Sequence, residues 1–142
     1  MVMQITTNST LQELLKLAEE KLASDLHINA DRPPVLRVYG KLQKVEDYPP
    51  ATNIEVREIL ESIISPEQMA KFITIKELDF SYENASGRFR VNACMQKNNV
   101  SLAFRLLMPF LSPLENLGLP KIFGETALKT RGLILVTGPT GS

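Results

Sequence analysis

The clearest chemical motif of this 142-residue sequence is the stretch "LILVTGPTGS" over residues 133–142. An apolar run there leads into Gly138, Pro139, Thr140, Gly141 and Ser142, which match the first part of the phosphate-binding loop Gly-x-x-x-x-Gly-Lys-Ser/Thr. In a complete loop, backbone N–H groups surround the phosphates, the lysine reaches the β- and γ-phosphates, and a hydroxyl holds Mg²⁺. The second glycine and the lysine would follow Ser142, so the sequence shows a partial nucleotide-binding loop.

The same glycines have a simpler interpretation, because Gly-Pro-x-Gly is also an ordinary turn. The apolar run before them does not alternate with polar residues, which is typical of a strand buried in a parallel sheet. A buried strand is the context that a phosphate-binding loop requires. We therefore predict a strand at "GLILVTG" and favour the loop interpretation.

A second candidate site comes from the middle of the sequence. Residues 77–83, 88–96 and 100–108 alternate between apolar and polar side chains, with turn signals between them. This pattern predicts three antiparallel strands that share one apolar face. The polar face would carry Asp79, Ser81, Arg90, Asn92 and Arg105.

A two-residue turn at Asn98-Asn99 predicts how the last two of these strands pair. Arg105 then lies opposite Asn92 and diagonal to Arg90. A four-residue turn before them places Asp79 opposite Asn92. On the apolar face the same pairing sets Phe80 against Val91, Phe89 against Met108, Val91 against Leu106, and Ala93 against Phe104.

The two arginines allow two interpretations. In the first, which the residue types alone favour, they form surface ion pairs with Asp79 and Glu83 that contribute little to stability. In the second, both guanidinium groups face phosphate oxygens, since the rigid fork of arginine suits that geometry. Two cations beside a single carboxylate leave positive charge on this face for an anion.

His27 is the only histidine and Cys94 the only cysteine. Neither has a second histidine or cysteine as a partner, so His27 is expected to be structural or hydrogen-bonded and Cys94 inert. No metal site is expected within this sequence.

Composition narrows the class of protein. The 16 basic and 16 acidic residues cancel, which argues against a nucleic-acid-binding domain. One cysteine allows no internal disulfide, and the N-terminus "MVMQITTNST" lacks the pattern of a signal peptide. No apolar run reaches transmembrane length. We therefore expect a cytoplasmic protein that does not insert into the membrane.

Helices and short strands are predicted before the three long strands. A first helix starts at a capping box of Thr10 with Glu13, a second covers residues 54–64, and a third starts at Ser65 with Gln68 as its box partner. Strands are expected at "SDLHINA" and on both sides of Gly40. The apolar stripe of the first helix is Leu11, Leu14, Leu15, Ala18 and Leu22.

A domain boundary is predicted near Pro109. Residues 1–110 have the pattern of a self-contained mixed α/β domain with an antiparallel sheet and flanking helices. In residues 111–142, "SPLENLG", a short helix in "KIFGETALKT" and the apolar strand are typical of the start of a parallel α/β domain.

Several motifs together resemble the type IV pilus retraction ATPases of the secretion-ATPase superfamily. They are "ASDLHI", "PPVLRVYGKL", "LDFSYE", "GRFRVNACMQ", "LAFR" and "RGLILVTGPTGS", and they follow the order of the family over nearly the whole chain. The resemblance implies a PAS-like N-terminal domain over residues 1–110. Residues 111–142 would then be a linker and the first elements of a RecA-like P-loop ATPase domain.

The resemblance also implies roles for particular residues. Arg90 in "RFRVN" and Arg105 in "AFR" match arginines that reach the γ-phosphate, where their charge stabilises the transition state. Leu117 and Leu119 would border the adenine, and residues 138–142 would begin the Walker A loop. ATP and Mg²⁺ are the implied cofactors of the complete ATPase, and none is expected to bind tightly to this chain alone.

The implied function is that of the N-terminal, nucleotide-sensing and regulatory portion of a hexameric ATPase that powers pilus retraction and twitching motility. Its implied partners are its own C-terminal ATPase domain, neighbouring subunits of a homohexamer and the pilus platform protein of the inner membrane. The protein would lie in the cytoplasm, peripheral to the inner membrane. The chain alone is expected to be inactive as an enzyme.

Two alternatives remain open. The chain could be a PAS-like sensing or interaction module that acts alone, or the equivalent domain of a pilus-assembly or type II secretion ATPase. ATPases of the latter kind usually carry a further domain upstream, whereas about ten residues precede the first predicted helix here. The short N-terminus favours the retraction type.

Overall fold

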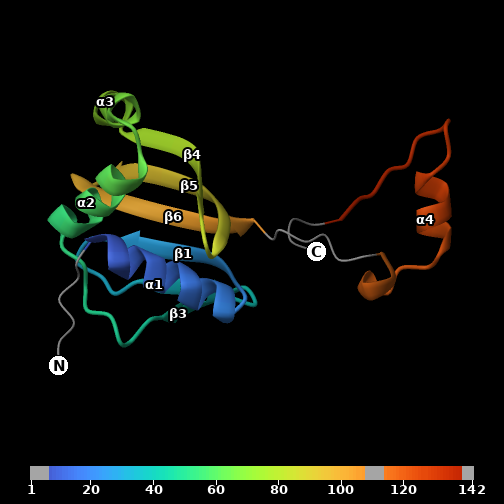
Figure 1. The fold of residues 1–142 in the computed structure, drawn as a ribbon, viewed down its shortest axis with the longest axis horizontal. Coiled ribbons are helices and arrows are strands. Elements are labelled where there is room, and N and C mark those ends of the chain that lie inside the picture. Colours follow the sequence, from blue (N-terminus) through green and yellow to red (C-terminus); the bar gives the residue numbers. More distant parts are fainter. Residues whose placement is uncertain (1–6, 108–113, 139–142) are drawn as a thin grey trace. The chain divides into compact units, whose positions relative to one another are not determined.

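The computed structural model describes residues 7–107 and 114–138, and it divides the chain into two compact units (Figure 1). Unit 1 spans Met1–Pro109 and unit 2 spans Phe110–Ser142. In its described residues, unit 1 combines three helices with a six-stranded antiparallel sheet. The predicted mixed α/β fold with an antiparallel sheet and flanking helices is confirmed.

The helices of unit 1 are α1 (Thr7–Glu20), α2 (Asn53–Ile63) and α3 (Pro66–Ile75). The start of α3 is confirmed: the Ser65 side chain accepts from the Gln68 N–H, and the Gln68 side chain accepts from the Ser65 N–H. Thr52 and Glu55 form the same reciprocal box at α2. Each box satisfies two backbone donors that the helix itself leaves without a partner, which fixes where these helices begin.

Helix α1 begins earlier than predicted, at Thr7. Thr10 therefore lies inside the helix, where it is buried, and the predicted box of Thr10 with Glu13 is wrong. Leu22 lies beyond the helix with a φ of 52° and an exposed side chain, so it does not belong to the buried stripe. The remaining predicted stripe residues are buried. An apolar stripe determines which face of a helix is buried, but it does not determine the terminal residues.

The strands of unit 1 are β1 (Ala23–Asn29), β2 (Val35–Val38), β3 (Lys41–Lys44), β4 (Glu77–Asn84), β5 (Gly87–Gln96) and β6 (Asn99–Leu107). Their order in the sheet is β3-β2-β1-β6-β5-β4, so the central pair comes from the two ends of unit 1. The predicted turn at Gly40 is confirmed. Tyr39 and Gly40 both have positive φ, as a tight hairpin turn requires.

The turn between β5 and β6 lies one residue earlier than predicted. Lys97 and Asn98 have φ values of 50° and 66°, the combination that a type I′ turn requires. As a result Arg90 lies directly opposite Arg105, and the predicted pairing of Arg105 with Asn92 is wrong. The sequence "KNN" contains two overlapping turn candidates, and the hydrophobic pattern does not distinguish them.

The correction changes partners but not faces. Val91 lies opposite Phe104 in place of Leu106, a shift of two positions, and a shift of two keeps every side chain on its own face of the sheet. The other corrected apolar pairs are Phe89 with Leu106 and Ala93 with Leu102. The predicted pairing of β4 with β5 is confirmed, with Asp79 opposite Asn92 and Phe80 opposite Val91.

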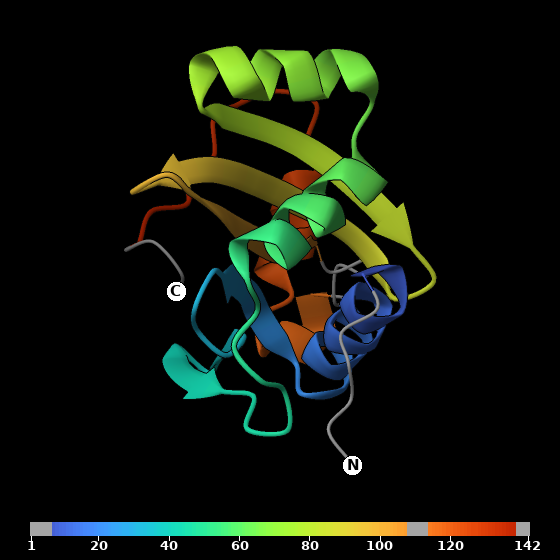
Figure 2. The same ribbon diagram turned by 90° about the vertical axis from the view of Figure 1, so that its left-hand side faces the viewer.

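One face of the sheet is covered by helices α1 and α2, which lie side by side over it in both views (Figures 1 and 2), while α3 contacts the edge strand β4. The core between these layers includes Phe89 and Phe104, which pack edge to face with ring centroids 6.4 Å apart. The other face of the sheet, which no described helix of unit 1 covers, is called the open face below. It carries the polar residues that the alternation predicted.

Unit 2 contains a 3₁₀ helix η1 (Leu114–Leu117) and a helix α4 (Ile122–Ala127) in its described residues, and α4 confirms the predicted short helix. The predicted strand at "GLILVTG" is wrong for this chain: residues 132–138 form no strand, and Leu133, Leu135 and Val136 are more than 70% exposed. A strand needs neighbours for its hydrogen-bond ladder, and the described part of unit 2 contains none.

None of the helices in the described ranges is long and apolar enough to cross a membrane.

Candidate phosphate site

A row of directly opposed residues, the charge row, crosses the open face from β2 to β4. Its members are Arg37, Asp25, Arg105, Arg90 and Ser81. The row contains two arginines as immediate neighbours, and like charges opposite one another on adjacent strands destabilise a sheet. The two candidate arginines are therefore closer than predicted, and their proximity requires compensating charge.

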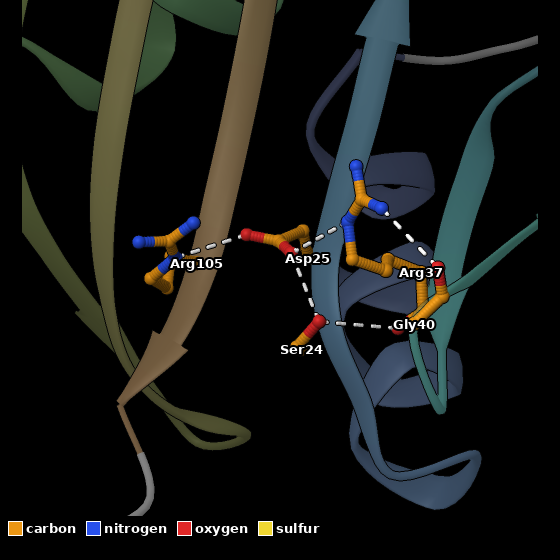
Figure 3. Close-up of polar contacts among 5 residues, drawn as sticks. All are labelled: Ser24, Asp25, Arg37, Gly40 and Arg105. Atoms are coloured by element: carbon orange, nitrogen blue, oxygen red, sulfur yellow. Dashed lines mark hydrogen bonds and ion pairs between the residues drawn. The ribbon is translucent and has the colours of Figure 1, made fainter. Parts of the chain in front are cut away.

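Asp25 supplies that charge to Arg105 (Figure 3). The Nε of Arg105 donates to Oδ1 of Asp25 at 3.0 Å, and the Nε of Arg37 lies 3.1 Å from Oδ2. The Asp25 side chain is only 10% exposed, whereas that of Arg105 is 67% exposed. One nearly buried carboxylate thus holds a guanidinium group on the strand to each side of its own.

The carboxylate of Asp25 is itself fixed by its neighbours. The hydroxyl of Ser24 donates to Oδ2 at 2.9 Å, and Nη1 of Arg37 donates to the carbonyl oxygen of Gly40 at 3.4 Å. Burial alone would raise the pKa of Asp25, but the hydrogen bonds from Ser24 and Arg105 and the charge of Arg105 lower it below its ordinary value. Asp25 therefore remains ionised near neutral pH.

Arg90 has a weaker partner on the other side of the row. Its Nη2 lies 3.4 Å from Oδ2 of Asp79, and the two side chains are 64% and 49% exposed. The predicted ion pair with Asp79 is confirmed, while the predicted pairing of an arginine with Glu83 does not occur among the described residues. An ion pair this exposed contributes at most about 1 kcal/mol.

A hollow of about 340 Å³ opens on this part of the sheet. The row's two neighbouring arginines line it together with Asp25, Asp79, His27 and Asn92. The two arginines and two aspartates of the lining cancel in formal charge; Arg37 beside Asp25 adds one positive charge, and Glu77, which accepts from Asn92, adds one negative charge. The lining can donate several hydrogen bonds to an anion, which is the chemistry expected of a phosphate site.

His27 lies on the same face of β1 as Asp25. Burial lowers its pKa; the charge of Asp25 opposes this, and those of Arg37 and Arg105 add to it. The ring is therefore neutral near pH 7. Its Nε2 is buried without a hydrogen-bond partner among the described residues, so the expected hydrogen bond is not found at that nitrogen.

Cys94 is half-buried on the open face and forms no disulfide. Within the described ranges, no three His, Cys, Asp or Glu side chains lie close enough together to hold a metal ion.

The other predicted site residues belong to unit 2. Leu119 is partly exposed and lines a shallow hollow with Leu114 and Pro120, and Gly138 is exposed. The side chain of Leu117 and all of Pro139, Thr140, Gly141 and Ser142 lie outside what the structure describes. Their predicted roles at adenine and phosphate stay predictions.

Asp25 and Arg37 are the residues that the sequence analysis missed. The motif "ASDLHI" contained the signal for Asp25: its side chain lies on the polar face of a strand whose Leu26 and Ile28 are buried. The pairing of that strand with β6 carried no local signal, because the two segments are far apart in the sequence. No expectation therefore connected Asp25 with Arg105.

No family model matches the chain. Among curated proteins, the type IV pilus retraction ATPase PilT of Pseudomonas aeruginosa is 37% identical over 133 residues, and the type IV pilus ATPase PilU of the same organism is 35% identical over 132 residues. These matches cover 93% and 92% of the chain but 38% and 34% of the relatives. A twitching motility protein of Neisseria gonorrhoeae is 36% identical over 110 residues, 77% of the chain and 29% of that protein.

Solved structures give the same result. The crystal structure of the pilus retraction motor PilT with bound ADP matches with a TM-score of 0.79 and 32% identity, and the ATPase DotB of Legionella pneumophila matches with a TM-score of 0.79 and 27% identity. Each match covers 98% of this chain and 40% of the other. The chain is thus a homologue of part of the secretion ATPases, and unit 1 corresponds to the N-terminal domain of the PilT structure.

Its sequence relatives include type IV pilus ATPases of the PilT and PilU type, as the motifs predicted.

Proposed function

We propose that this chain is the N-terminal, nucleotide-sensing portion of an ATPase that powers the retraction of type IV pili. The observation that carries the proposal is the direct opposition of Arg90 and Arg105 on the open face, where both arginines line one hollow. Like charges directly opposite one another destabilise a sheet, and an anion bound by both arginines would relieve the repulsion that Asp25 and Asp79 leave. The names of the PilT and PilU relatives and the ADP bound in the PilT structure support a nucleotide as that anion.

The two guanidinium groups would act on the γ-phosphate. As the terminal phosphoryl group is transferred, its oxygens and the leaving group share negative charge, which fixed cations stabilise. Asp25 accepts from the Nε of Arg105, and neither Nη1 nor Nη2 has a partner among the described residues, so both can bind phosphate oxygens. Arg90 can exchange its weak contact with Asp79 for a phosphate oxygen with little loss.

The lining fits the phosphates of ATP but not Mg²⁺, because the described residues contain no cluster of metal ligands. Mg²⁺ would neutralise phosphate charge when it is bound, and its ligands would belong to an ATPase domain. In the same proposal, residues 138–142 begin the Walker A loop of that domain, and Leu117 and Leu119 border the adenine. The chain alone would then bind nucleotide weakly and hydrolyse none.

The proposal includes the surroundings of the protein. Unit 1 would be a PAS-like domain that contacts its own ATPase domain and the neighbouring subunits of a homohexamer. The hexamer would act on the cytoplasmic side of the inner membrane, against the pilus platform protein. This chain would bind no nucleic acid, consistent with its net charge of zero.

The test measures ATP hydrolysis by the full protein that carries this chain together with its ATPase domain. Arg90→Ala and Arg105→Ala should each lower kcat by about 100-fold or more, with little change in KM, because they remove charge that acts in the transition state. Arg88→Ala is the matched control, since Arg88 lies on the same strand and the same face as Arg90 and is opposite Glu83. Wild-type turnover in both arginine variants would overturn the proposal.

A second candidate function is the equivalent domain of an ATPase from another secretion system, which the match to DotB favours. Deletion of the gene separates the two. Loss of a retraction ATPase leaves pili on the cell surface that no longer retract, whereas loss of an assembly or secretion ATPase abolishes the pili or the secreted product. A module that acts alone is excluded if the codons after Ser142 read Gly-Lys in frame.

A further inference from the structure

The two neighbouring arginines of the charge row bind carboxylates on opposite sides. Arg105 bonds to Asp25 on the β1 side, and Arg90 contacts Asp79 on the β4 side. Directly opposed residues on adjacent strands have Cβ atoms only about 5 Å apart, so unrestrained guanidinium groups would compete for the same space. Asp25 and Asp79 lie on the outer sides of the arginine pair, and the two arginines and two carboxylates together line the hollow.

The restraint on Arg105 is specific to one edge of its guanidinium group. Asp25 accepts from Nε, and the described residues offer no partner to Nη1 or Nη2. A side chain that is held at Nε keeps the outer end of its fork free for the two oxygens of an anion. The bond thus restricts the direction of the side chain without using the atoms that would bind phosphate.

Asp25 is a suitable anchor because it cannot readily move. It lies in a central strand, its side chain is 10% exposed, and Ser24 and Arg37 both bind Oδ2. Asp79, by contrast, lies on the edge strand β4 and is 49% exposed. Only one of the two arginines therefore has a rigid support.

We propose that Asp25 is a positioning residue of the phosphate site, which holds Arg105 by its Nε and keeps its outer nitrogens directed at the bound phosphate. This inference rests on the proposed function of Arg90 and Arg105. It adds a residue that touches no nucleotide and acts through Arg105. The support extends one strand further, because Arg37 and Ser24 hold the anchor itself.

The first measurement uses this chain in solution and detects the Nε–H signal of Arg105 by ¹⁵N NMR, assigned by its loss in Arg105→Lys. The Nε–H of the wild-type chain should exchange slowly with water. Asp25→Asn should speed this exchange by about tenfold or more, the factor that corresponds to one hydrogen bond to a charged group. Asp79→Asn, the matched change on the edge strand, should leave the Arg105 signal unaltered.

The second measurement is ATP hydrolysis by the full protein. Asp25→Asn should lower kcat by about 10- to 100-fold with little change in KM, because a misplaced catalytic group loses rate more than binding. The double variant Asp25→Asn with Arg105→Ala should be no slower than Arg105→Ala alone, since Asp25 acts only through Arg105. Ser24→Ala, a milder change beside the anchor, should give a smaller loss in the same direction and serves if Asp25→Asn folds poorly.

The outcomes separate this inference from the proposed function. If Arg105→Ala hydrolyses ATP like the wild type, the proposed function fails and the inference fails with it. If Arg105→Ala is impaired while Asp25→Asn and Ser24→Ala are not, only the inference is overturned. Losses that add in the double variant would also overturn it, because they would show that Asp25 acts on stability or on another group.

Discussion

Arg90 and Arg105 are neighbours in one row of one sheet, yet their partners differ in kind. Arg105 is bound to a nearly buried carboxylate in a central strand, which a serine and a second arginine hold in place. Arg90 touches an exposed carboxylate on an edge strand at 3.4 Å. A charge-assisted bond to a nearly buried carboxylate restrains a side chain, whereas a bond to an exposed carboxylate allows it to exchange partners with solvent or ligand.

The two arginines are therefore expected to play different roles at a phosphate site. A fixed cation provides preorganised charge, which costs no rearrangement at the moment of reaction. A loosely held cation can follow a ligand as it enters and leaves. The comparison predicts that replacing Asp25 lowers both stability and function, while replacing Asp79 has little effect on stability.

The largest effect on stability is expected from Asp25→Asn. The substitution keeps the shape of the side chain but leaves Arg37 and Arg105 without their counter-charge, so the free energy of unfolding should fall by about 2–3 kcal/mol. Asp79→Asn should lower it by about 0.5 kcal/mol. Urea unfolding of this chain measures both. Equal losses in the two variants would remove the basis of the comparison.

Acid should abolish the contribution that the ionised Asp25 side chain makes to the free energy of unfolding. The folded-state pKa of Asp25 is lowered, so its contribution to stability is present above the ordinary aspartate value of about 4 and is lost as the pH falls through the lowered folded value. The difference in unfolding free energy between the wild type and Asp25→Asn should therefore shrink steadily below about pH 4. A difference that stays constant down to pH 2 would show that charge is not what Asp25 contributes.

Ser24→Ala tests the second layer of support. The loss of one hydroxyl donor to Oδ2 of Asp25 should cost about 1 kcal/mol, and the pKa of Asp25 should rise toward its ordinary value. The carboxyl resonance of Asp25, followed by NMR during an acid titration, reports the pKa directly. An unchanged titration would show that Arg37 and Arg105 hold the carboxylate without help.

The smallest effect is expected at His27, which lines the hollow between the two sides. Its folded-state pKa is lowered, so the unfolded chain binds more protons than the folded chain as the pH falls below about 6.5, and stability should decrease there. In His27→Gln this decrease should disappear. Melting temperatures at pH 7.5 and pH 5.5 compare the two proteins, and an identical decrease in both would place the titrating group elsewhere.

Local chemistry explains which parts of the fold could be predicted. Alternation along β4, β5 and β6 assigned each side chain to its face, and the Ser65–Gln68 box gave the start of α3. These signals depend on neighbours in the sequence. The turn at Lys97-Asn98 was misplaced by one residue because three polar residues in a row offer two turns of equal length, and the backbone geometry that selects one is not visible in the residue types.

The candidate site could be predicted only in part, for a related reason. The two arginines were found because they lie on the two strands of one hairpin, and their face followed from the alternation. The anchor Asp25 comes from a strand whose pairing with β6 is not a local property. The strand predicted at "GLILVTG" failed in the opposite way, since a correct apolar pattern lacks the neighbouring strands that would make it a sheet.

The central position of β1 and β6 also constrains how the molecule folds. Asp25 and Arg105 are 80 residues apart in the sequence, so the middle of the sheet closes a long loop, which slows folding relative to pairing between neighbours. During synthesis, β1 leaves the ribosome long before β6, so Leu26 and Ile28 remain without their partners on β6 until that strand has been made. The charge row crosses β2, β1, β6, β5 and β4, so it can be intact only after the junction between β1 and β6 has closed.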